Sequence, residues 1–295
     1  MKDSKKIYAL GFFDGVHLGH QALLAECVRL SREMGAIPAA ITFDQHPQAL
    51  LTAHPPLLLT GIRERQQLLA DHGIEQIRVF PVTKEVMSTT WQDFLHLLRE
   101  AGAAGFVCGE DFRFGHRGEG DSLKLRAYCE AENIPCVIVP EQQLDGIRIS
   151  STHIRKLLEE GNTETAAKFL GHPHILTGNV TPGRQVGRTI GIPTANLLIE
   201  DGIVVPKLGV YACHVTIDGK KWPAVTNIGS RPTVGGHQVR AESWILGFEG
   251  DLYGRTLTLE FRKFLRPEQR FDSLEQLQKQ IRSDAGKAAE LLGES

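Results

Sequence analysis

The sequence predicts an α/β protein with two parts: an N-terminal parallel sheet flanked by helices, and a small C-terminal antiparallel β-barrel followed by a helix. Over the first half, short apolar runs alternate with segments of helical period, as in βαβ units. From about Gly178 the chain is rich in Gly, Pro, Val, Thr and Ile and alternates in polarity, as in "GVYACHVTIDG" and "RTLTLEFRKFL", which is typical of antiparallel strands. The tail "SLEQLQKQIRSDAGKAAELL" regains helical periodicity.

The first part is expected to form a doubly wound sheet. Its expected strands are Ile7–Phe12, Ala39–Phe43, Gln76–Phe80, Gly105–Gly109 and Cys136–Val139. The expected helices between them are Gln21–Met34, Ile62–Asp71, Thr90–Glu100 and Leu123–Glu132. In the first helix, Leu24, Cys27, Val28 and Ser31 follow the i, i+3, i+4, i+7 spacing of a face that lies on a sheet. Sheets of this kind bind ligands beyond the carboxyl ends of their strands.

The second part is expected to be a barrel closed by hairpins. Asp218-Gly219 between Ile217 and Lys220 is a strong hairpin signal, and the density of glycines and turns is typical of small antiparallel barrels. Ser273 and Gln276 are spaced for a capping box at the start of the last helix. We place the domains at residues 1–172 and 173–295.

Composition narrows the class of protein and its partners. A length of 295 residues favours about two domains, and 41% hydrophobic with 23% charged residues is ordinary for a globular protein. The net charge of −2 argues against nucleic acid as a partner, so small molecules are the expected ligands. The oligomeric expectation is a monomer or a weak homo-oligomer.

Cysteine usage and the N-terminus point to the cytoplasm. The five cysteines, Cys27, Cys108, Cys129, Cys136 and Cys213, include no C-x-x-C pair, which argues against a disulfide framework and a zinc site. "MKDSKKIYAL" lacks the apolar region of a signal peptide. No apolar run reaches the roughly 18 residues of a membrane-spanning helix, so we expect a cytoplasmic protein without a membrane partner.

Two histidines follow the first expected strand in "ALGFFDGVHLGHQALL", from Ala9 to Leu24. If a helix begins near residues 16–18, His17 and His20 project from its first turn on nearly one face. Free backbone N–H groups and the helix dipole make that end an anion site, and glycines at 15 and 19 allow close backbone approach. In the other interpretation Asp14 caps the helix and the histidines are ordinary surface residues; spacing alone does not separate the two.

A second stretch, "GIRISSTHIRKLL", strengthens the anion-site interpretation. It places Ser150, Ser151 and Thr152 at a helix start, with Arg155 one turn later. Hydroxyl groups, helix N–H groups and a guanidinium together suit a phosphate. Alone, such a stretch is more often an N-cap, but with the histidine pair it favours a nucleotide site.

Together, "GFFDGVHLGH" and "ISSTHIR" resemble the H-x-G-H and I-S-S-T-x-x-R signatures of the Rossmann-like nucleotidyltransferase fold. In detail the chain resembles the bacterial bifunctional riboflavin kinase/FMN adenylyltransferases (FAD synthetases) almost end to end, including "TFDQHP" and "GEDFRFGHRGEGD". This resemblance implies transfer of AMP from ATP to FMN, which gives FAD and pyrophosphate, with magnesium assisting. It implies catalytic roles for His17, His20 and Arg155.

The same resemblance implies two sets of binding residues in the first domain. ATP would be bound by Gly11, Phe12, Asp14, His17, His20, Ser150, Ser151, Thr152 and Arg155. The flavin would be bound by Phe43, Asp44, Pro47, Asp111 and Phe114. Phe112 belongs to the same motif, and for it apolar packing is an equally good interpretation.

A third motif lies in "GNVTPGRQVGRTIGIPTANLLI". Its glycines suit either a loop over phosphates or a turn-rich connection, and its spacing is not that of a P-loop. Thr194 and Asn196 place two oxygens on one side of an extended strand, and hard oxygen ligands suit Mg²⁺. The stretch resembles the riboflavin kinase signature, which implies ATP binding by Gly183, Gly187, Arg188, Thr194 and Asn196, with Mg²⁺ on the last two.

Glu242 is the general base that this resemblance implies, taking the proton from the ribityl 5′-hydroxyl. The pattern around it, taken alone, describes a solvent-facing strand residue. Where the family has E-x-H-x-x-D, this chain has Glu242, Trp244 and Gly247. Two further departures are Gln45 in the family's F-D-P-H-P and His153 in its I-S-S-T-R-I-R.

Three functions remain to be compared. The favoured one is a bifunctional enzyme that makes FMN from riboflavin and ATP and then converts FMN into FAD. The first alternative is a riboflavin kinase whose adenylyltransferase domain is impaired by Gln45 and His153. The second is a flavin- or nucleotide-sensing binding protein, which the intact set of reactive residues disfavours.

Overall fold

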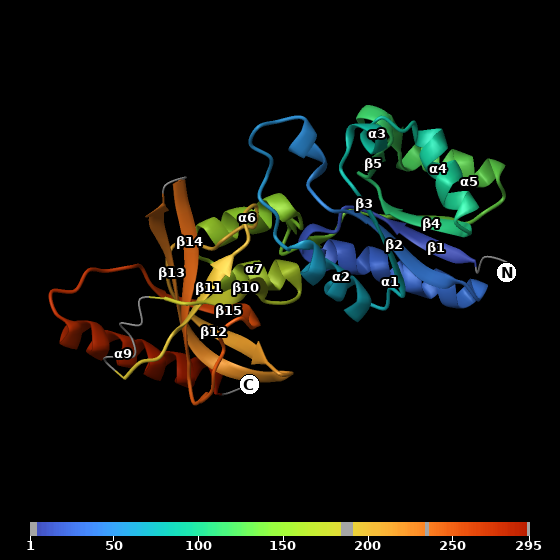
Figure 1. The fold of residues 1–295 in the computed structure, drawn as a ribbon. Helices are drawn as coiled ribbons and strands as arrows, with labels where there is room; N and C mark the ends of the chain where they lie inside the picture. Colours follow the sequence, from blue (N-terminus) through green and yellow to red (C-terminus); the bar gives the residue numbers. More distant parts are fainter. Residues whose placement is uncertain (1–4, 184–190, 234–235, 294–295) are drawn as a thin grey trace. The chain divides into compact units, whose positions relative to one another are not determined.

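Residues 6–139 contain a parallel sheet that has helices on both faces (Figure 1). The structure is a computed structural model and describes residues 5–183, 191–233 and 236–293. The strands run in the order β3-β2-β1-β4-β7, and each neighbouring pair is parallel. Their bounds are β1 Lys6–Leu10, β2 Ile37–Phe43, β3 Gln76–Phe80, β4 Ala103–Gly109 and β7 Cys136–Val139. The predicted doubly wound sheet is therefore confirmed.

Alternate residues of the central strand β1 face two separate helix layers. Ile7 and Ala9 belong to the core that includes the buried faces of α1 and α2, whereas Tyr8 and Leu10 belong to the core with α4 and α5. A strand buried on both faces is a continuous apolar run in the sequence, which made β1 recognisable. The helices are α1 Leu18–Met34, α2 Ile62–Asp71, α4 Trp91–Glu100 and α5 Ser122–Ala131.

The first strand ends earlier than the sequence predicts. It was expected to run to Phe12 but ends at Leu10, because Phe13 adopts a left-handed backbone with φ 57° that turns the chain. Several short elements were not expected, since each is too short to show a period. These are η1 Asp14–Val16, η2 Pro47–Leu50, η3 His116–Gly118, α3 Lys84–Met87 and the hairpins β5 Arg113–Phe114 with β6 Gly120–Asp121 and β8 Gln143–Leu144 with β9 Ile147–Arg148.

The C-terminal part is a closed antiparallel barrel in the order β10-β11-β14-β13-β12-β15. Buried side chains such as Tyr211, Val215 and Leu259 fill its interior, and α9 packs Ala285 and Ala288 outside it. This confirms the predicted barrel and terminal helix. The elements are α6 Ser151–Glu159, α7 Thr163–Leu170, β10 His174–Thr181, β11 Ala195–Ile199, β12 Gly209–Ile217, β13 Lys220–Thr233, β14 Gly236–Ile245, β15 Thr256–Arg266 and α9 Leu274–Leu292.

Two local signals are borne out in atomic detail. Asp218 and Gly219 have φ 50° and 77°, the two positive values that a type I′ turn between β12 and β13 requires. At the start of α9, the Ser273 hydroxyl accepts a hydrogen bond from the Gln276 N–H at 3.2 Å. The Gln276 side chain reaches back to the N–H of Asp272 at 3.3 Å, one residue before the position expected for a capping box.

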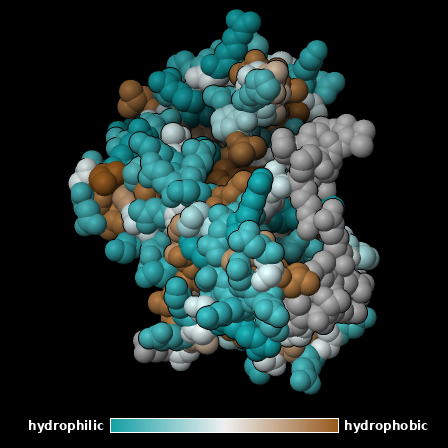
Figure 2. All heavy atoms as spheres, turned by 90° about the vertical axis from the view of Figure 1, so that its left-hand side faces the viewer, coloured by the Kyte–Doolittle hydropathy of each residue, from teal (hydrophilic) through white to brown (hydrophobic). Residues whose placement is uncertain are grey.

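By its contacts the chain divides into two units, Met1–Ser151 and Thr152–Ser295. Helices α6 and α7 are thereby grouped with the barrel, and the domain division placed after residue 172 stays a prediction. Among the described residues, no helix is both long and apolar enough to cross a membrane. Hydrophilic side chains cover most of the face drawn in Figure 2, and apolar ones form smaller groups on it.

Candidate functional sites

The turn that follows β1 is tightly built and strained. Phe13 and Val16 both have positive φ, 57° and 39°, which costs free energy for residues that have a side chain and occurs mainly at functional sites. Gly11 is required there because a Cβ at this position would lie 2.8 Å from Cζ of Phe13. The turn therefore holds one conformation at the carboxyl end of the central strand.

The two histidines of this turn stack on each other at the start of α1. His17 is the N-cap residue, and its Nδ1 accepts a hydrogen bond from the His20 N–H at 3.3 Å. The ring centroids are 3.6 Å apart and the planes are inclined by 12°, so the expectation that both imidazoles lie on one face is confirmed. The alternative that Asp14 caps this helix is wrong.

Burial disfavours the charged form of His20. The pKa of His20 lies well below its usual 6.5, chiefly because burial penalises the imidazolium and also because of positive charge on His17 and Arg65. His17 is itself only 7% exposed. Imidazole N–H groups at a helix N-terminus are suited to donate hydrogen bonds to an anion, whose negative charge would in turn favour the imidazolium form.

The two sequence motifs of the first domain meet through Ser151. This residue begins α6, and its hydroxyl donates a hydrogen bond to the backbone carbonyl of Asp14 at 3.1 Å. Ser151 therefore lies against the histidine turn. Ser150 precedes this contact; Thr152 and Arg155 follow on α6 within the second unit.

Asp14 has a structural position that the sequence did not suggest. Its carboxylate is 1% exposed and accepts hydrogen bonds from the N–H groups of Leu59 at 2.8 Å and Thr60 at 3.3 Å. The Gly15 N–H donates to the Thr60 hydroxyl at 3.1 Å. Asp14 thus ties the turn to the loop before α2, and its expected contact with ATP stays a prediction.

The expected flavin residues follow β2 and β4. At the end of β2, the Asp44 carboxylate accepts a hydrogen bond from the Val82 N–H at 2.8 Å, which fixes the loop after β3. In the segment after β4, Asp111 forms an exposed ion pair with Arg148 at 2.6 Å. Pro47 begins η2. Because β2 and β4 are parallel and lie on either side of β1, the two segments follow strand ends at the same carboxyl edge of the sheet.

A row of aromatic rings joins these two segments. Phe43, Phe80, Phe94, Phe114 and Phe112 follow one another with centroid distances of 6.2, 5.9, 5.7 and 5.5 Å. Phe114 is buried and Phe112 stacks on it. Phe112 therefore packs against another aromatic ring, as the apolar-packing interpretation expects. Phe43, at the other end of the row, is the last residue of β2.

In the barrel, strand register places three polar side chains in a row. Glu242 on β14 lies directly opposite Asn196 on β11 and opposite Asn227 on β13. Directly opposed residues of antiparallel strands have Cβ atoms about 4.5–5.5 Å apart. The expected base and the expected magnesium ligand are therefore neighbours. Asn227, which was not singled out in the sequence, donates a hydrogen bond to Glu268 at 3.2 Å.

Glu242 opens into a cavity of about 240 Å³ between the barrel and α9. Trp244 and Phe271 contribute aromatic rings to its lining, and so do Arg266 and the buried Asp284, which form an ion pair at 2.8 Å. Its lining residues are Ile192, Thr194, Val210, Val225, Asn227, Glu242, Trp244, Arg266, Glu268, Gln269, Phe271, Leu277, Ile281 and Asp284. An aromatic slot with a carboxylate in its wall suits a planar ring system that carries a hydroxyl-bearing chain.

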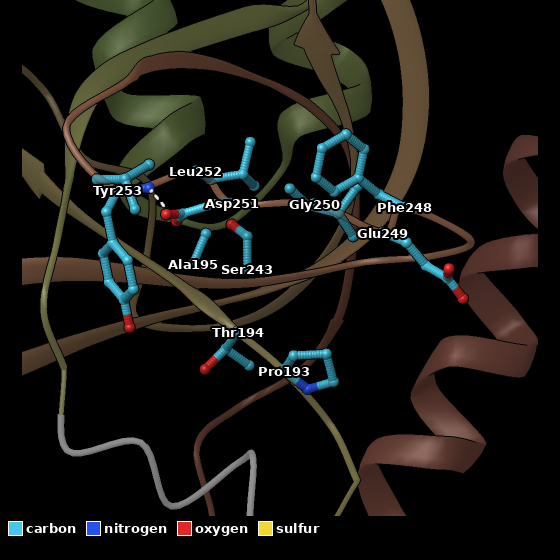
Figure 3. Close-up of a pocket in the computed structure, with 12 residues that line it drawn as sticks. Pro193, Thr194, Ala195, Ser243, Phe248, Glu249, Gly250, Asp251, Leu252 and Tyr253 are labelled. Atoms are coloured by element: carbon cyan, nitrogen blue, oxygen red, sulfur yellow. Dashed lines mark hydrogen bonds between the residues drawn. The ribbon is translucent and has the colours of Figure 1, made fainter.

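A second cavity, of about 200 Å³, lies on the other side of Thr194 (Figure 3). The hydroxyl ends of Thr194 and Tyr253 point to the same side of this cavity, whereas the Glu249 carboxylate points away. In the loop between β14 and β15, the Tyr253 N–H donates a hydrogen bond to the Asp251 carboxylate at 3.0 Å. Thr194 lines both cavities, so it lies at their common boundary.

The glycine loop expected over the phosphates is described only in part. A Cβ on Gly183 would lie 2.3 Å from Nδ2 of Asn196, so only glycine allows the backbone to approach this side chain. Gly187 and Arg188 lie outside the described residues. The contact between Gly183 and Asn196 links the start of the loop to the row of polar residues.

Two family models match this chain: "FAD synthetase" over residues 1–153 and "Riboflavin kinase" over residues 170–292. The bifunctional riboflavin kinase/FMN adenylyltransferase of Escherichia coli (strain K12) is 37% identical over 97% of this chain and 93% of its own length. The protein of the same name from Listeria monocytogenes is 34% identical over 96% and 91%. A crystal structure from Streptococcus pneumoniae, titled a macrolide-efflux protein, superposes with a TM-score of 0.87 at 32% identity, over 96% of this chain and 93% of that one.

Proposed function

The chain belongs to the bifunctional riboflavin kinase/FMN adenylyltransferase family, and we propose how its residues divide the two reactions between two separate sites. The enzyme phosphorylates riboflavin with ATP to FMN, and it transfers AMP from ATP to FMN to give FAD and pyrophosphate. The observation that carries the division is spatial: the histidine turn and the row around Glu242 belong to different units. The kinase-only alternative is not favoured.

Adenylyl transfer is placed at the turn after β1. An oxygen of the FMN phosphate attacks the α-phosphorus of ATP, and the bond to the departing pyrophosphate breaks, so no protein nucleophile is needed. His17 and His20, with the N–H groups at the start of α1, hold the triphosphate and stabilise its charge. Ser150, Ser151, Thr152 and Arg155 neutralise the pyrophosphate, with Gly11, Phe12 and Asp14 shaping the site. The stacked imidazoles and the contact from Ser151 support this placement.

The flavin of this reaction is placed over the ends of β2 and β4, on Phe43, Asp44, Pro47, Asp111 and Phe114. Of the two departures from the family in this domain, Gln45 is exposed. His153 packs edge-on against Phe169 with centroids 4.8 Å apart. Neither removes a side chain from the histidine turn, which supports an active adenylyltransferase.

Phosphorylation of riboflavin is placed in the barrel. The isoalloxazine ring lies in the cavity with Trp244 and Phe271, and the adenine nucleotide lies in the cavity of Figure 3. Glu242 takes the proton of the ribityl 5′-hydroxyl. The 5′-oxygen of riboflavin attacks the γ-phosphorus of ATP, and ADP leaves. Thr194 lies where the two substrates meet, because it lines both cavities.

Mg²⁺ is proposed to be held by the Thr194 hydroxyl and the Asn196 amide oxygen. Neutral hard oxygen donors fit this ion, which usually keeps water and phosphate oxygens as its other ligands. When bound, it neutralises phosphate charge in the transition state. The close approach of Gly183 to Asn196 supports a fixed ligand position.

We further propose that the protein is cytoplasmic, acts on small molecules without nucleic acid or membrane partners, and is a monomer or weak homo-oligomer. The near-neutral charge of −2 and the five free cysteines support this environment.

The test is a separation of the two activities in one polypeptide. The purified protein is incubated with riboflavin, ATP and magnesium, and the flavins are separated by chromatography over time. Glu242→Gln should lower FMN formation by about 10²–10⁴-fold and leave conversion of added FMN to FAD intact. His17→Ala with His20→Ala should do the reverse. If either folded variant loses both steps, or if Glu242→Gln still makes FMN at the normal rate, the proposed division is wrong.

A further inference from the structure

Arg65 is a charged residue in the core of the first unit. It lies on α2 and is 0% exposed, which makes it one of the largest fully buried side chains among the described residues. A buried guanidinium is costly unless hydrogen bonds replace its water. Burial lowers the pKa of Arg65, and the negative charges of Asp14 and Glu64 partly offset this by raising it. The segments that its hydrogen bonds connect therefore indicate what this residue does.

The guanidinium of Arg65 reaches three segments of the chain. Nη1 donates to the backbone carbonyl of Phe43 at 2.8 Å and to the Thr42 hydroxyl at 3.2 Å. The same nitrogen lies 3.5 Å from the Phe12 carbonyl, and the guanidinium carbon lies 4.4 Å from the Phe12 ring centroid. Nη2 donates to the Thr60 carbonyl at 3.1 Å. Its ion pair with Asp14 is long, at 4.0 Å.

Two of these partners, the carbonyls of Phe12 and Phe43, belong to the segments that we assign to ATP and to the flavin. Phe12 begins the turn that carries the two histidines, and Phe43 ends the strand of the proposed flavin side. Thr42 adds a second link between them, because its hydroxyl donates to the Phe12 carbonyl at 2.6 Å while it accepts from Arg65. One planar group with a fixed fork of donors therefore sets the spacing of the two segments.

We propose that Arg65 is a positioning residue for adenylyl transfer: it clamps the ATP-side turn at Phe12 to the flavin-side strand end at Phe43. The inference rests on the location proposed above for this reaction. In-line attack requires the FMN phosphate oxygen and the α-phosphorus to approach to about 3–3.5 Å, and a misplacement of about 1 Å costs about 10²-fold in rate. The clamp acts on the relative position of two bound substrates, so its loss lowers kcat more than it raises either KM.

If Arg65 only stabilises the fold, a different result is expected. In that case its replacement lowers the free energy of unfolding, while each folded molecule keeps its kcat. The kinase reaction, catalysed in the other unit, measures the amount of intact barrel in every sample. The unfolding transition of the first unit measures the fraction of each variant that is folded there, and the rate at saturating ATP and FMN divided by that folded concentration gives kcat.

The test compares Arg65→Lys and Thr42→Val with the exposed control Arg63→Lys on the same helix. Lysine keeps the charge but offers no rigid fork, so Arg65→Lys should lower kcat for FAD formation by about 10–100-fold with both KM values within about threefold. Thr42→Val removes the shared hydroxyl and should lower kcat by a smaller factor, about 3–10-fold. FMN formation should be unchanged in all three, and Arg63→Lys should match the parent protein.

Unchanged kcat in folded Arg65→Lys overturns the proposal, and so does a rise in KM at constant kcat. If Arg65→Lys does not fold, Thr42→Val decides, because valine fills nearly the same volume; a kcat equal to that of the parent then overturns it. The histidine variants separate this inference from the site proposal. If His17→Ala with His20→Ala leaves FAD formation intact, the location of the reaction is wrong, whereas dependence on the histidines with indifference to Arg65 refutes the clamp alone.

Discussion

His174 makes the stability of the barrel sensitive to acid. It is 1% exposed on β10, and its Nε2 bonds the Val204 carbonyl at 3.1 Å. Burial lowers the pKa of His174 from its usual 6.5 to about 4. The neutral ring is therefore favoured in the folded state, and its contribution to stability is complete above pH 6.5. As the pH falls towards 4, the unfolded chain takes up the proton first and this stability is lost.

The size of the effect follows from the two pKa values. A difference of one pKa unit is worth about 1.4 kcal/mol, so a pKa of about 4 instead of 6.5 implies a loss of about 3 kcal/mol between pH 6.5 and 4. This is a large fraction of the roughly 5–15 kcal/mol that stabilises a typical domain. Other groups titrate in the same range, so the contribution of His174 is the difference between the protein and its His174→Gln variant.

The assay is urea unfolding at a series of pH values in a Trp91→Phe background. The chain has three tryptophans, and this change leaves Trp222 and Trp244, both in the second unit, as reporters. His174→Gln should flatten the dependence of the free energy of unfolding on pH by about 3 kcal/mol over this range. His96→Gln is the control, because the His96 side chain is 72% exposed. An equally steep dependence with glutamine at position 174 refutes the reasoning.

Three further changes test local features. Gly219→Ala places a side chain at φ 77° in the β12–β13 turn and should destabilise the barrel by about 1 kcal/mol in urea unfolding; no change would contradict the turn assignment. Ser273→Ala removes the cap of α9 and should cost about 1 kcal/mol, whereas Ser273→Asp should retain it. Gly11→Ala brings a Cβ to 2.8 Å from the Phe13 ring and should slow FAD formation while FMN formation, assayed in parallel, stays normal.

The sequence predicted best what depends on neighbours along the chain. The range Ile62–Asp71 was expected as a helix and is observed with the same bounds. Asp218-Gly219 was expected to turn a hairpin, and both residues have the required positive φ. Periodicity and turn chemistry are local properties, so they need no knowledge of which strands become neighbours. The same holds for Ser273 and Gln276 at the start of α9.

What the sequence could not predict depends on pairing between distant segments. An arginine at position 65 in a polar helical stretch is typical of a solvated face, and only the packed sheet shows that it is buried. Asn227 gave no signal, because its importance comes from lying opposite Glu242 across the β13–β14 register. The position of Thr194 between two cavities likewise requires the closed barrel.

Asp14 shows how a motif combines two kinds of residue. The stretch "GFFDGVHLGH" was interpreted as a single ATP-binding unit, yet the Asp14 carboxylate contacts Leu59 and Thr60 while the imidazoles of His17 and His20 stack at the helix start. A short motif can hold a phosphate only if its backbone stays fixed, because free N–H groups must converge on one point. Two strained, non-glycine residues in this turn would relax without an internal anchor. The buried carboxylate is that anchor, so its place in the motif follows from the geometry that the histidines require.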